Sequence, residues 1–407
     1  MKIMFFSIAS PFFQGYLRIY CVSLPLQQTN RDMEDKERIV FLDWLRVIAC
    51  IMVMLIHSTE PFYLGNGGTL ITCEANAFWS TIIDSAIRAA VPLYVMTSSY
   101  LLFPLVTDTR SFFKRRFTRV GFPLLVWLLA YSFLPMVGDG FGSVDVAANA
   151  RHLPLNFPFT AGHLWFLYMI LGIYLAMPIF SPWAARLSKR GEECFLALWL
   201  FTTAVPFFRK LAVAIFGLPE VFGEASWNEF GTLYYISGFM GYVILAHYLK
   251  RHVPKYHWRK TLAIAIPLWV VGFVIVASWF WHYIPKSFPV ETDINLAIHL
   301  ETSWTYCSIG VALTTIAYFL VARHFSANGP FYHRWIIPLS RLSFGIYLIH
   351  IFFLGIVYQG TTLLLSSWNT WIATPVTILL TGILTFAISA IATKLISYLP
   401  FSKYIIG

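Results

Sequence analysis

Histidine and arginine side chains lie inside stretches that are otherwise apolar enough to cross a membrane. His57 closes the run 41–58, Arg46 lies eleven residues before it, and Arg88 lies within the apolar stretch 78–104. An ionisable side chain in the bilayer costs a few kcal/mol unless it has a partner, so each is a functional candidate by default. Imidazole exchanges a proton near neutral pH, and guanidinium binds anionic oxygen. The three residues therefore predict acid–base chemistry on a substrate that carries or develops negative charge.

The first run places its polar residues on one helical face. Asp43, Arg46, Cys50, Val53 and His57 follow one another at steps of three and four, the spacing of a single face. Asp43 and Arg46 can neutralise each other, and His57 lies roughly 16 Å further along at 1.5 Å per residue. The alternative is a structural ion pair at the membrane edge and an interfacial histidine.

Three further patterns repeat this theme on other segments. Asp84 and Arg88 are four residues apart, with Pro92 following, and a kinked helix with a self-neutralised pair would also explain them. Polar contacts that hold neighbouring helices together would explain the stripe of Ser340, Ser343, Tyr347 and His350 equally well. An aromatic belt at the membrane interface would explain His163 and Trp165. Taken together, four polar faces must turn inward. They predict a polar cavity that is cationic toward the cytoplasm and rich in histidine toward the outside.

The composition requires a membrane protein to position these residues. Of 407 residues, 58% are hydrophobic and 12% are charged, against roughly 25% charged in soluble domains. The five cysteines have no CxxC spacing, so we expect no metal site. Because a helix needs ~20 apolar residues to span, we predict an all-α fold of about ten transmembrane helices. They lie near 40–58, 78–104, 117–136, 164–181, 193–208, 230–249, 261–283, 303–322, 335–358 and 371–396.

The distribution of Lys and Arg orients these spans. With the first span running outward, 20 Lys and Arg fall on one side and 4 on the other. The positive-inside rule then puts both termini in the cytoplasm, so the net charge of +10 reads as a topology signal rather than as nucleic-acid binding. We expect outer loops at 59–77, 137–163, 209–229, 284–302 and 359–370. Residues 1–32 read as an N-terminal extension of uncertain status, because Met33 resembles a natural start.

Six stretches in this order resemble the acyltransferase-3 family of integral membrane acyltransferases, in particular its short bacterial O-acetyltransferases. They are FLDWLRVIACIMVMLIHS at 41–58, RAAVPLYVMTSSYLL at 88–102, FFKRRFTRVGFP at 112–123, HLWFL at 163–167, YYISGFMGY at 234–242 and LSRLSFGIYLIH at 339–350. The resemblance covers nearly all of 38–396. It implies that residues 33–407 form one transmembrane acyltransferase domain.

The resemblance implies transfer of an acyl group, usually acetyl, from cytoplasmic acyl-CoA to a hydroxyl of a glycan or lipid-linked sugar in the bacterial inner membrane. It makes His57, Arg46 and Arg88 the catalytic residues, and it implies no bound cofactor. We predict that donor and acceptor contact Asp43, Arg115, Arg116, Arg119, His163, Trp165, Tyr347 and His350. With no fused extracytoplasmic domain expected, the chain completes transfer itself or hands over to a separate glycan-assembly protein.

Two points stay open at the level of the sequence. The family usually has Ser-Gly-Tyr where this chain has Ser98-Ser99-Tyr100. Serine can take the place of a glycine that is needed for close helix packing, but not of a glycine that must adopt a positive φ. A secondary transporter of an anionic or sugar-like substrate would also bury arginine and histidine. Absence of broken-helix repeats and presence of the family motifs favour the enzyme.

Overall fold

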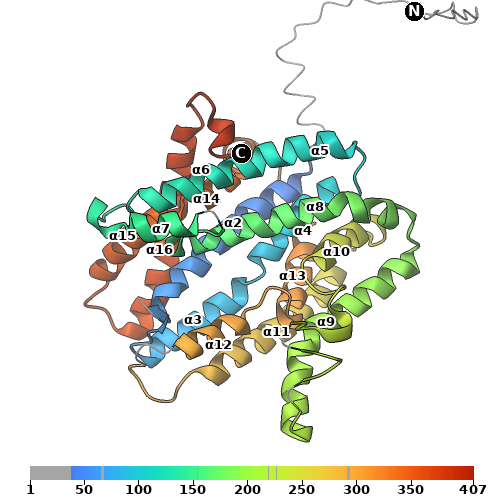
Figure 1. The fold of residues 1–407 in the computed structure, drawn as a ribbon, viewed down its shortest axis with the longest axis horizontal. Helices are drawn as coiled ribbons and strands as arrows, with labels where there is room; N and C mark the ends of the chain where they lie inside the picture. Colours follow the sequence, from blue (N-terminus) through green and yellow to red (C-terminus); the bar gives the residue numbers. More distant parts are fainter. Residues whose placement is uncertain (1–37, 66–67, 154, 219, 226, 291–293) are drawn as a thin grey trace, which may run out of the picture. The chain divides into compact units, whose positions relative to one another are not determined.

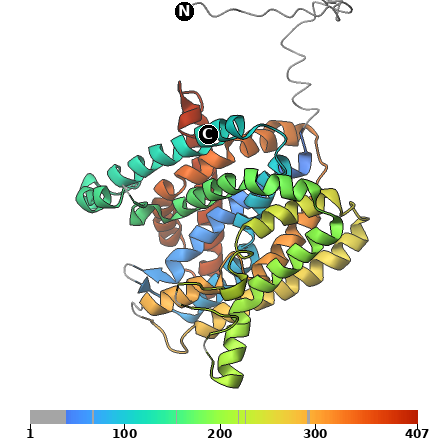
Figure 2. The same cartoon turned by 45° about the vertical axis from the view of Figure 1, so that its right-hand side comes forward.

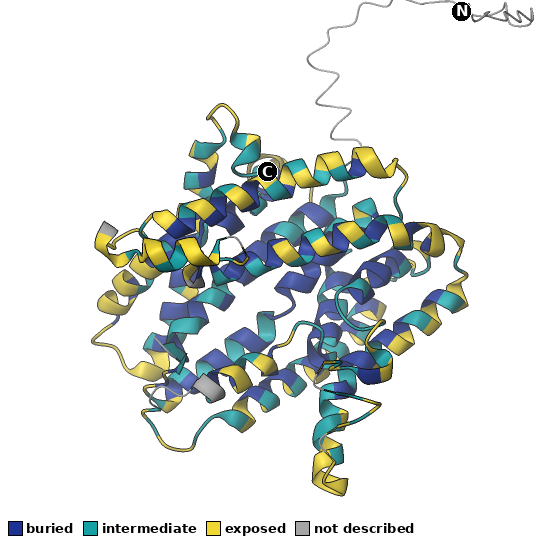
Figure 3. Ribbon diagram, in the orientation of Figure 1, coloured by how far each residue is buried: buried dark blue, intermediate teal, exposed yellow. Residues whose placement is uncertain are grey.

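Twenty residues from Val40 to Thr59 form the helix against which many of the others pack. In the computed structural model, α2 (Val40–Thr59) contacts α3, α4, α14 and α16, and Figures 1 and 2 show it passing between them. Twelve of its residues are buried, among them Asp43, Cys50 and Met54. The burial colours of Figure 3 show the same, since α2 and α4 are mostly buried while α5 and α9 expose more of their surface.

The structure describes residues 38–65, 68–153, 155–218, 220–225, 227–290 and 294–407, so the predicted extension 1–32 lies outside the described residues. After α2, the α-helices are α3 (Glu74–Ile87), α4 (Ala90–Leu102), α5 (Thr109–Arg116), α6 (Phe122–Phe133), α7 (Val146–His152), α8 (Trp165–Arg186), α9 (Lys189–Phe216), α10 (Met240–Arg251), α11 (Trp258–Tyr283), α12 (Ile294–Ser303), α13 (Ile309–Ala322), α14 (Ile337–Ile349), α15 (Ile351–Leu364) and α16 (Thr370–Ile396).

Shorter elements connect these helices. Two π-helical segments, η2 (Phe117–Gly121) and η6 (Tyr332–Ile336), lead into α6 and α14. The 3₁₀ turns are η1 (Glu60–Phe62), η3 (Phe141–Ser143), η4 (Phe159–Leu164), η5 (Gly231–Leu233) and η7 (Ser402–Tyr404). A two-stranded antiparallel sheet joins β1 (Leu64–Gly65) to β2 (Gly68–Thr69).

Length and hydropathy confirm an all-α polytopic membrane protein. Within the described residues, five helical segments are long and apolar enough to cross a bilayer: Val40–Phe62, Thr160–Arg186, Lys189–Phe216, Trp258–Tyr283 and Thr370–Ile396. A sixth span is possible if the bent pair Tyr332–Ile349 and Ile351–Leu364 counts as one. The predicted total of ten, and the cytoplasmic position of both termini, stay predictions.

Several predicted spans differ from the helices that form. The stretch 78–104 is not one helix, because α3 ends at Ile87 and α4 begins at Ala90. Pro92 has no N–H to give to the carbonyl of Arg88 four residues back, which is where the break falls. The span predicted at 230–249 is helical only from Met240, and α9 continues past Pro206 to Phe216, into a predicted loop.

The predicted span 335–358 is bent rather than straight. Its two helices meet at His350 at an angle of 81°. The polar stripe on α14 is nevertheless buried, as predicted, at Ser340, Ser343, Tyr347 and His350. Ser340 donates to Asp43 near the beginning of α2, and the ring of His350 lies 5.0 Å from that of His57 near its end.

Candidate functional site

A cavity of about 960 Å³ lies where the C-terminal end of α2 meets η1, η4, α12 and the start of α15. That volume is at the upper end of what small-molecule sites usually enclose. Its polar and charged lining includes His57, Glu60, Arg88, Thr160, His163 and Glu301. Most of these residues belong to predicted outer loops or to the span ends beside them, so the predicted orientation puts the cavity on the outer side.

His57 and Glu60 form a hydrogen-bonded pair on the cavity wall. Nδ1 of His57 lies 2.7 Å from Oε1 of Glu60, three residues along the chain at the junction of α2 and η1. Because an ionised carboxylate only accepts, Nδ1 carries the proton in this pair. Nε2 is then the nitrogen that can take a proton from a substrate. The side chain of His57 is 17% exposed and that of Glu60 34% exposed.

His163 and His350 join His57 in a group of three imidazoles. The ring centroid of His350 lies 5.0 Å from that of His57 and 5.1 Å from that of His163. Nδ1 of His350 lies 2.6 Å from the carbonyl oxygen of Tyr347, and the Tyr347 hydroxyl donates to the carbonyl of His163. Three ring nitrogens have no hydrogen-bond partner among the described residues: Nδ1 and Nε2 of His163, and Nε2 of His350.

Arg88, which also lines the cavity, is held by three neighbours. Its Nη1 lies 3.3 Å from Oδ1 of the fully buried Asp84, Nη2 lies 3.8 Å from Oε2 of Glu301, and Nε donates to the carbonyl of Trp304 at 3.1 Å. The guanidinium also lies over the rings of Trp304 and Tyr306, 5.2 and 4.8 Å from their centroids. The predicted pairing of Asp84 with Arg88 is confirmed, and the arginine nonetheless faces the cavity.

Aromatic side chains make up much of the remaining wall. Trp165 and Tyr306 stack with centroids 5.4 Å apart and planes 25° apart, and Phe239 lies 6.1 Å from Trp165. All three line the cavity. Of the residues predicted from sequence, the structure thus brings His57, Arg88, His163 and Trp165 to one cavity, with Tyr347 and His350 packed behind His163.

Asp43 and Arg46 lie near the other end of α2 and do not line this cavity. Asp43 accepts hydrogen bonds from Tyr332 at 2.7 Å and Ser340 at 2.6 Å, and Nη1 of Arg46 lies 3.7 Å from it. Asp43 therefore joins α2 to η6 and α14. The polar passage expected from Arg46 to His57 is not part of the cavity, and a functional role for Asp43 and Arg46 stays a prediction.

The predicted basic stretch also lies away from the cavity. Arg115 and Arg116 end α5, and Arg119 lies in η2. Asp108 begins α5 by accepting the backbone N–H of Ser111 at 2.9 Å, which lowers the pKa of the Asp108 carboxyl. Arg115 and Arg119 are exposed, whereas Arg116 is half-buried over the rings of Phe112 and Tyr174. Two exposed guanidinium groups one helical turn apart suit a phosphate-bearing ligand.

Ser99 is compatible with its position in the family motif. It lies within α4, and the non-glycine residues with positive φ in the described part of the chain are Phe222 and Phe401. Its side chain is fully buried and its hydroxyl donates to the carbonyl of Val95 at 2.7 Å. The position therefore does not require glycine for its backbone conformation.

Sequence reasoning missed two acidic residues of the site. Glu60 carries a local signal, the i, i+3 spacing from His57, which the assignment of 59–77 to a loop obscured. Glu301 carries none, because it lies more than 200 residues from Arg88 and Tyr63, the two residues it contacts. Only the folded chain brings α12 to the cavity.

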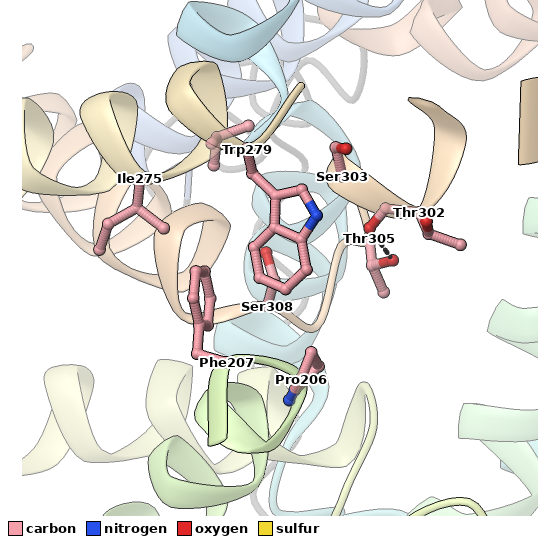
Figure 4. Close-up of a pocket in the computed structure, with 9 residues that line it drawn as sticks. Pro206, Phe207, Ile275, Trp279, Thr302, Ser303, Thr305 and Ser308 are labelled. Carbon is pink, nitrogen blue, oxygen red and sulfur yellow. Dashed lines mark hydrogen bonds between the residues drawn. The ribbon is translucent and has the colours of Figure 1, made fainter. Parts of the chain in front are cut away.

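A second, smaller cavity lies between α9, α11 and the segment before α13 (Figure 4). It has a volume of about 20 Å³ and is lined by Phe207, Trp279 and Ser308 among others. That is room for about one water molecule, so it is no substrate site. In the part of the chain that the structure describes, no group of three or more His, Cys, Asp or Glu side chains is arranged to hold a metal ion.

Comparison with known proteins bears on what this site does. No curated protein and no solved structure matches the chain. One family does match: the acyltransferase-3 model, described as an acyltransferase domain, covers residues 39–394. That range includes both walls of the cavity, with His57, Arg88, His163 and Glu301. The chain therefore belongs to the acyltransferase-3 family of multi-pass membrane acyltransferases.

Proposed function

We propose that the protein is an O-acetyltransferase of the bacterial cytoplasmic membrane. It moves an acetyl group from acetyl-CoA to a hydroxyl of a glycan or lipid-linked saccharide. The observation that carries the proposal is the His57–Glu60 pair on the wall of a cavity large enough for a substrate. A histidine whose Nδ1 is held by a carboxylate is an arrangement suited to general-base catalysis at Nε2.

The reaction needs one proton transfer in each direction. Nε2 of His57 takes the proton of the acceptor hydroxyl as its oxygen attacks the carbonyl carbon of the thioester. The tetrahedral intermediate then breaks its C–S bond, and the imidazolium returns the proton to the departing CoA sulfur. The Glu60 carboxylate stabilises the imidazolium while it exists. The products are an acetyl ester and free CoA thiol, so no further reactant is needed.

Arg88 is the group best placed to stabilise the oxyanion. Among the described residues that line the cavity, Arg88 is the one Lys or Arg. Asp84 and the carbonyl of Trp304 hold its side chain in one orientation. Its N–H groups are held in fixed positions, and hydrogen-bond donors that need not reorganise during the reaction stabilise negative charge as it develops. His163 also lines the cavity, and we assign it as a second donor for the same oxygen once its ring turns toward the substrate.

The donor's phosphates and its thioester need different surroundings. Arg115, Arg116 and Arg119 attract the phosphates on the cytoplasmic side, and the uncharged pantetheine arm carries the acetyl group toward the cavity. The cavity lining includes Ile56, Ile351 and Leu354, aliphatic side chains that suit an apolar arm. The transporter alternative is not carried forward, because the family match is to an acyltransferase domain.

Turnover by purified protein tests the proposal. The full chain is reconstituted in phospholipid nanodiscs with acetyl-CoA and a bacterial glycan extract, and both free CoA thiol and acetylated glycan are measured. His57→Ala is compared with His152→Ala, which removes an exposed histidine on α7. Loss of acetyl transfer in the first variant alone supports the proposal. Near-normal transfer by His57→Ala at equal folded protein would eliminate the role given to His57.

A further inference from the structure

The charges on the cavity wall define the kind of acceptor it can hold. Two carboxylates face the cavity, those of Glu60 and Glu301, with 34% and 43% of their side chains exposed. Of the described residues that line the cavity, Arg88 is the one Lys or Arg, and 7% of its side chain is exposed. The wall that a substrate meets is therefore acidic, although the protein as a whole carries a net charge of +10.

Carboxylates beside Arg88 offset the positive charge that it offers to a charged substituent of the acceptor. Asp84 and Glu301 lie 3.3 and 3.8 Å from its guanidinium, and Tyr63 donates to the other oxygen of Glu301 at 2.6 Å. Asp84 in turn accepts from Thr59 at 3.1 Å. A charged substituent of the acceptor would therefore meet the carboxylates of Glu60 and Glu301 and one arginine that is already paired with carboxylates. A carboxylate or phosphate placed there is repelled, whereas hydroxyl and ammonium groups donate to Glu60 and Glu301.

His163 gives a second, independent indication of a polar but uncharged ligand. The residue is 5% exposed, lines the cavity, and has no hydrogen-bond partner at either ring nitrogen among the described residues. Neutral imidazole offers one donor and one acceptor. A sugar hydroxyl satisfies both, since it donates and accepts, whereas a carboxylate satisfies only the donor. A buried nitrogen left without a partner is unfavourable. Both nitrogens are enclosed by protein, so the ring turns toward the cavity when a ligand hydroxyl completes this wall.

The aromatic side chains of the cavity wall suit the C–H faces of a sugar ring. The rings of Trp165 and Phe239 flank the cavity, and a pyranose presents C–H faces that pack against such rings. Sites of this kind combine apolar and aromatic walls with a few polar groups that fix orientation.

We infer that the cavity selects a neutral or amino-bearing sugar as acceptor and excludes uronic acids and phosphorylated sugars, with Glu301 as the residue that sets this preference. The inference rests on the proposed function. Glu301 acts on the substrate's charge and not on the reacting atoms, so it determines specificity.

Glycan analysis of cells tests the inference directly. The full chain, or no protein, is expressed in a bacterial host whose surface glycans contain both neutral and acidic sugars, and mass spectrometry locates each new acetyl ester. New esters confined to neutral or amino sugars support the inference. New esters on uronic acids or phosphorylated sugars would overturn it while leaving the acetyltransferase intact. If no ester appears on any sugar, the proposed function itself fails, and the inference fails with it.

A variant then assigns the preference to one side chain. Glu301→Gln keeps the shape and removes the charge, so the ratio of acidic to neutral sugars acetylated rises by about tenfold, the effect of a repulsion of ~1.4 kcal/mol. Glu220→Gln, in an exposed loop away from the cavity, is the matched control and leaves the ratio unchanged. An unchanged ratio in Glu301→Gln would remove Glu301 from the inference. Because the wild-type pattern is read first, poor folding of the variant does not hide the answer.

Discussion

Nδ1 of His57 and Oε1 of Glu60 lie 2.7 Å apart, where the last turn of α2 passes into a 3₁₀ turn. Two residues that the chain separates by one turn therefore act as a single unit, with the carboxylate fixing the proton on one nitrogen and leaving the other for chemistry. The geometry depends on η1 following α2 directly, since α2 ends at Thr59 and η1 begins at Glu60. Glu60→Gln keeps the hydrogen-bond length but removes the charge that stabilises the imidazolium. We expect kcat to fall about 10- to 100-fold with little change in KM for either substrate, a loss like that seen when a metal-bound histidine loses its carboxylate partner.

The comparison is with His57→Ala, for which we expect a loss of about 10²- to 10⁴-fold. Initial rates of CoA release in nanodiscs give both values, and Glu220→Gln serves as the matched charge control. If Glu60→Gln raised KM alone, Glu60 would bind substrate instead of positioning His57.

The Asp84–Arg88 pair gives a prediction about folding. Asp84→Asn leaves the guanidinium of Arg88 buried with only the more distant Glu301 as a charged partner. Removing one member of a buried pair typically destabilises a protein by about 3–5 kcal/mol. We expect a lower thermal transition for the detergent-solubilised protein.

The double variant Asp84→Asn with Arg88→Met separates stability from activity. It removes the buried charge, so the transition temperature should recover most of the loss, while acetyl transfer stays absent because the oxyanion has lost its partner. Recovery of both properties would show that Arg88 is only structural.

Close packing of α9 on α10 makes Gly241 sensitive to substitution. A Cβ at Gly241 would lie 2.0 Å from the ring of Trp199, whose Nε1 donates to the carbonyl of Gly238 at 2.8 Å. Because the ring is fully buried, Gly241→Ala should cost about 1–3 kcal/mol of stability. Gly172→Ala is the control, since nothing lies within 4 Å of its added Cβ in α8. Thermal unfolding of both variants checks the contrast, and equal stability would contradict it.

The basic stretch predicts how the donor binds. Replacing Arg115 and Arg119 together by Gln should raise KM for acetyl-CoA about tenfold with kcat nearly unchanged, because each exposed guanidinium contributes binding to phosphate and none to chemistry. Adding salt should weaken binding to the wild type more than to the variant. The matched control is Arg151→Gln with Arg190→Gln, which removes two charges elsewhere in exposed positions. An unchanged KM for acetyl-CoA would show that Arg115 and Arg119 do not bind its phosphates.

Membrane orientation is open to a labelling test. The Lys and Arg distribution predicts that position 220 faces outward and position 110 faces the cytoplasm. In whole cells, a membrane-impermeant maleimide should label Glu220→Cys at once and Arg110→Cys only after permeabilisation, with the parent chain subtracted. The reverse pattern would invert the topology and put the cavity on the cytoplasmic side.

The sequence by itself determined the class of fold and half of the site. Hydropathy and the charge deficit establish a helical membrane protein, because a bilayer tolerates few other ways to satisfy the backbone. Steps of three and four placed His57, Arg88 and His350 on polar faces, and such faces must turn inward. Inward-facing polar faces predicted that His57, Arg88 and His163 would meet, and the resemblance to the family added Trp165 to the predicted site.

Only the tertiary structure decided which polar faces share a cavity. Arg46 and His57 lie on one face of one helix, yet the length of α2 keeps them roughly 16 Å apart, and only His57 reaches the cavity. Glu301 and Tyr306 join it through contacts across more than 200 residues, which no local periodicity encodes. The 81° bend at His350 was also beyond the pattern, whereas Pro92 marks the break at Arg88 in the sequence itself.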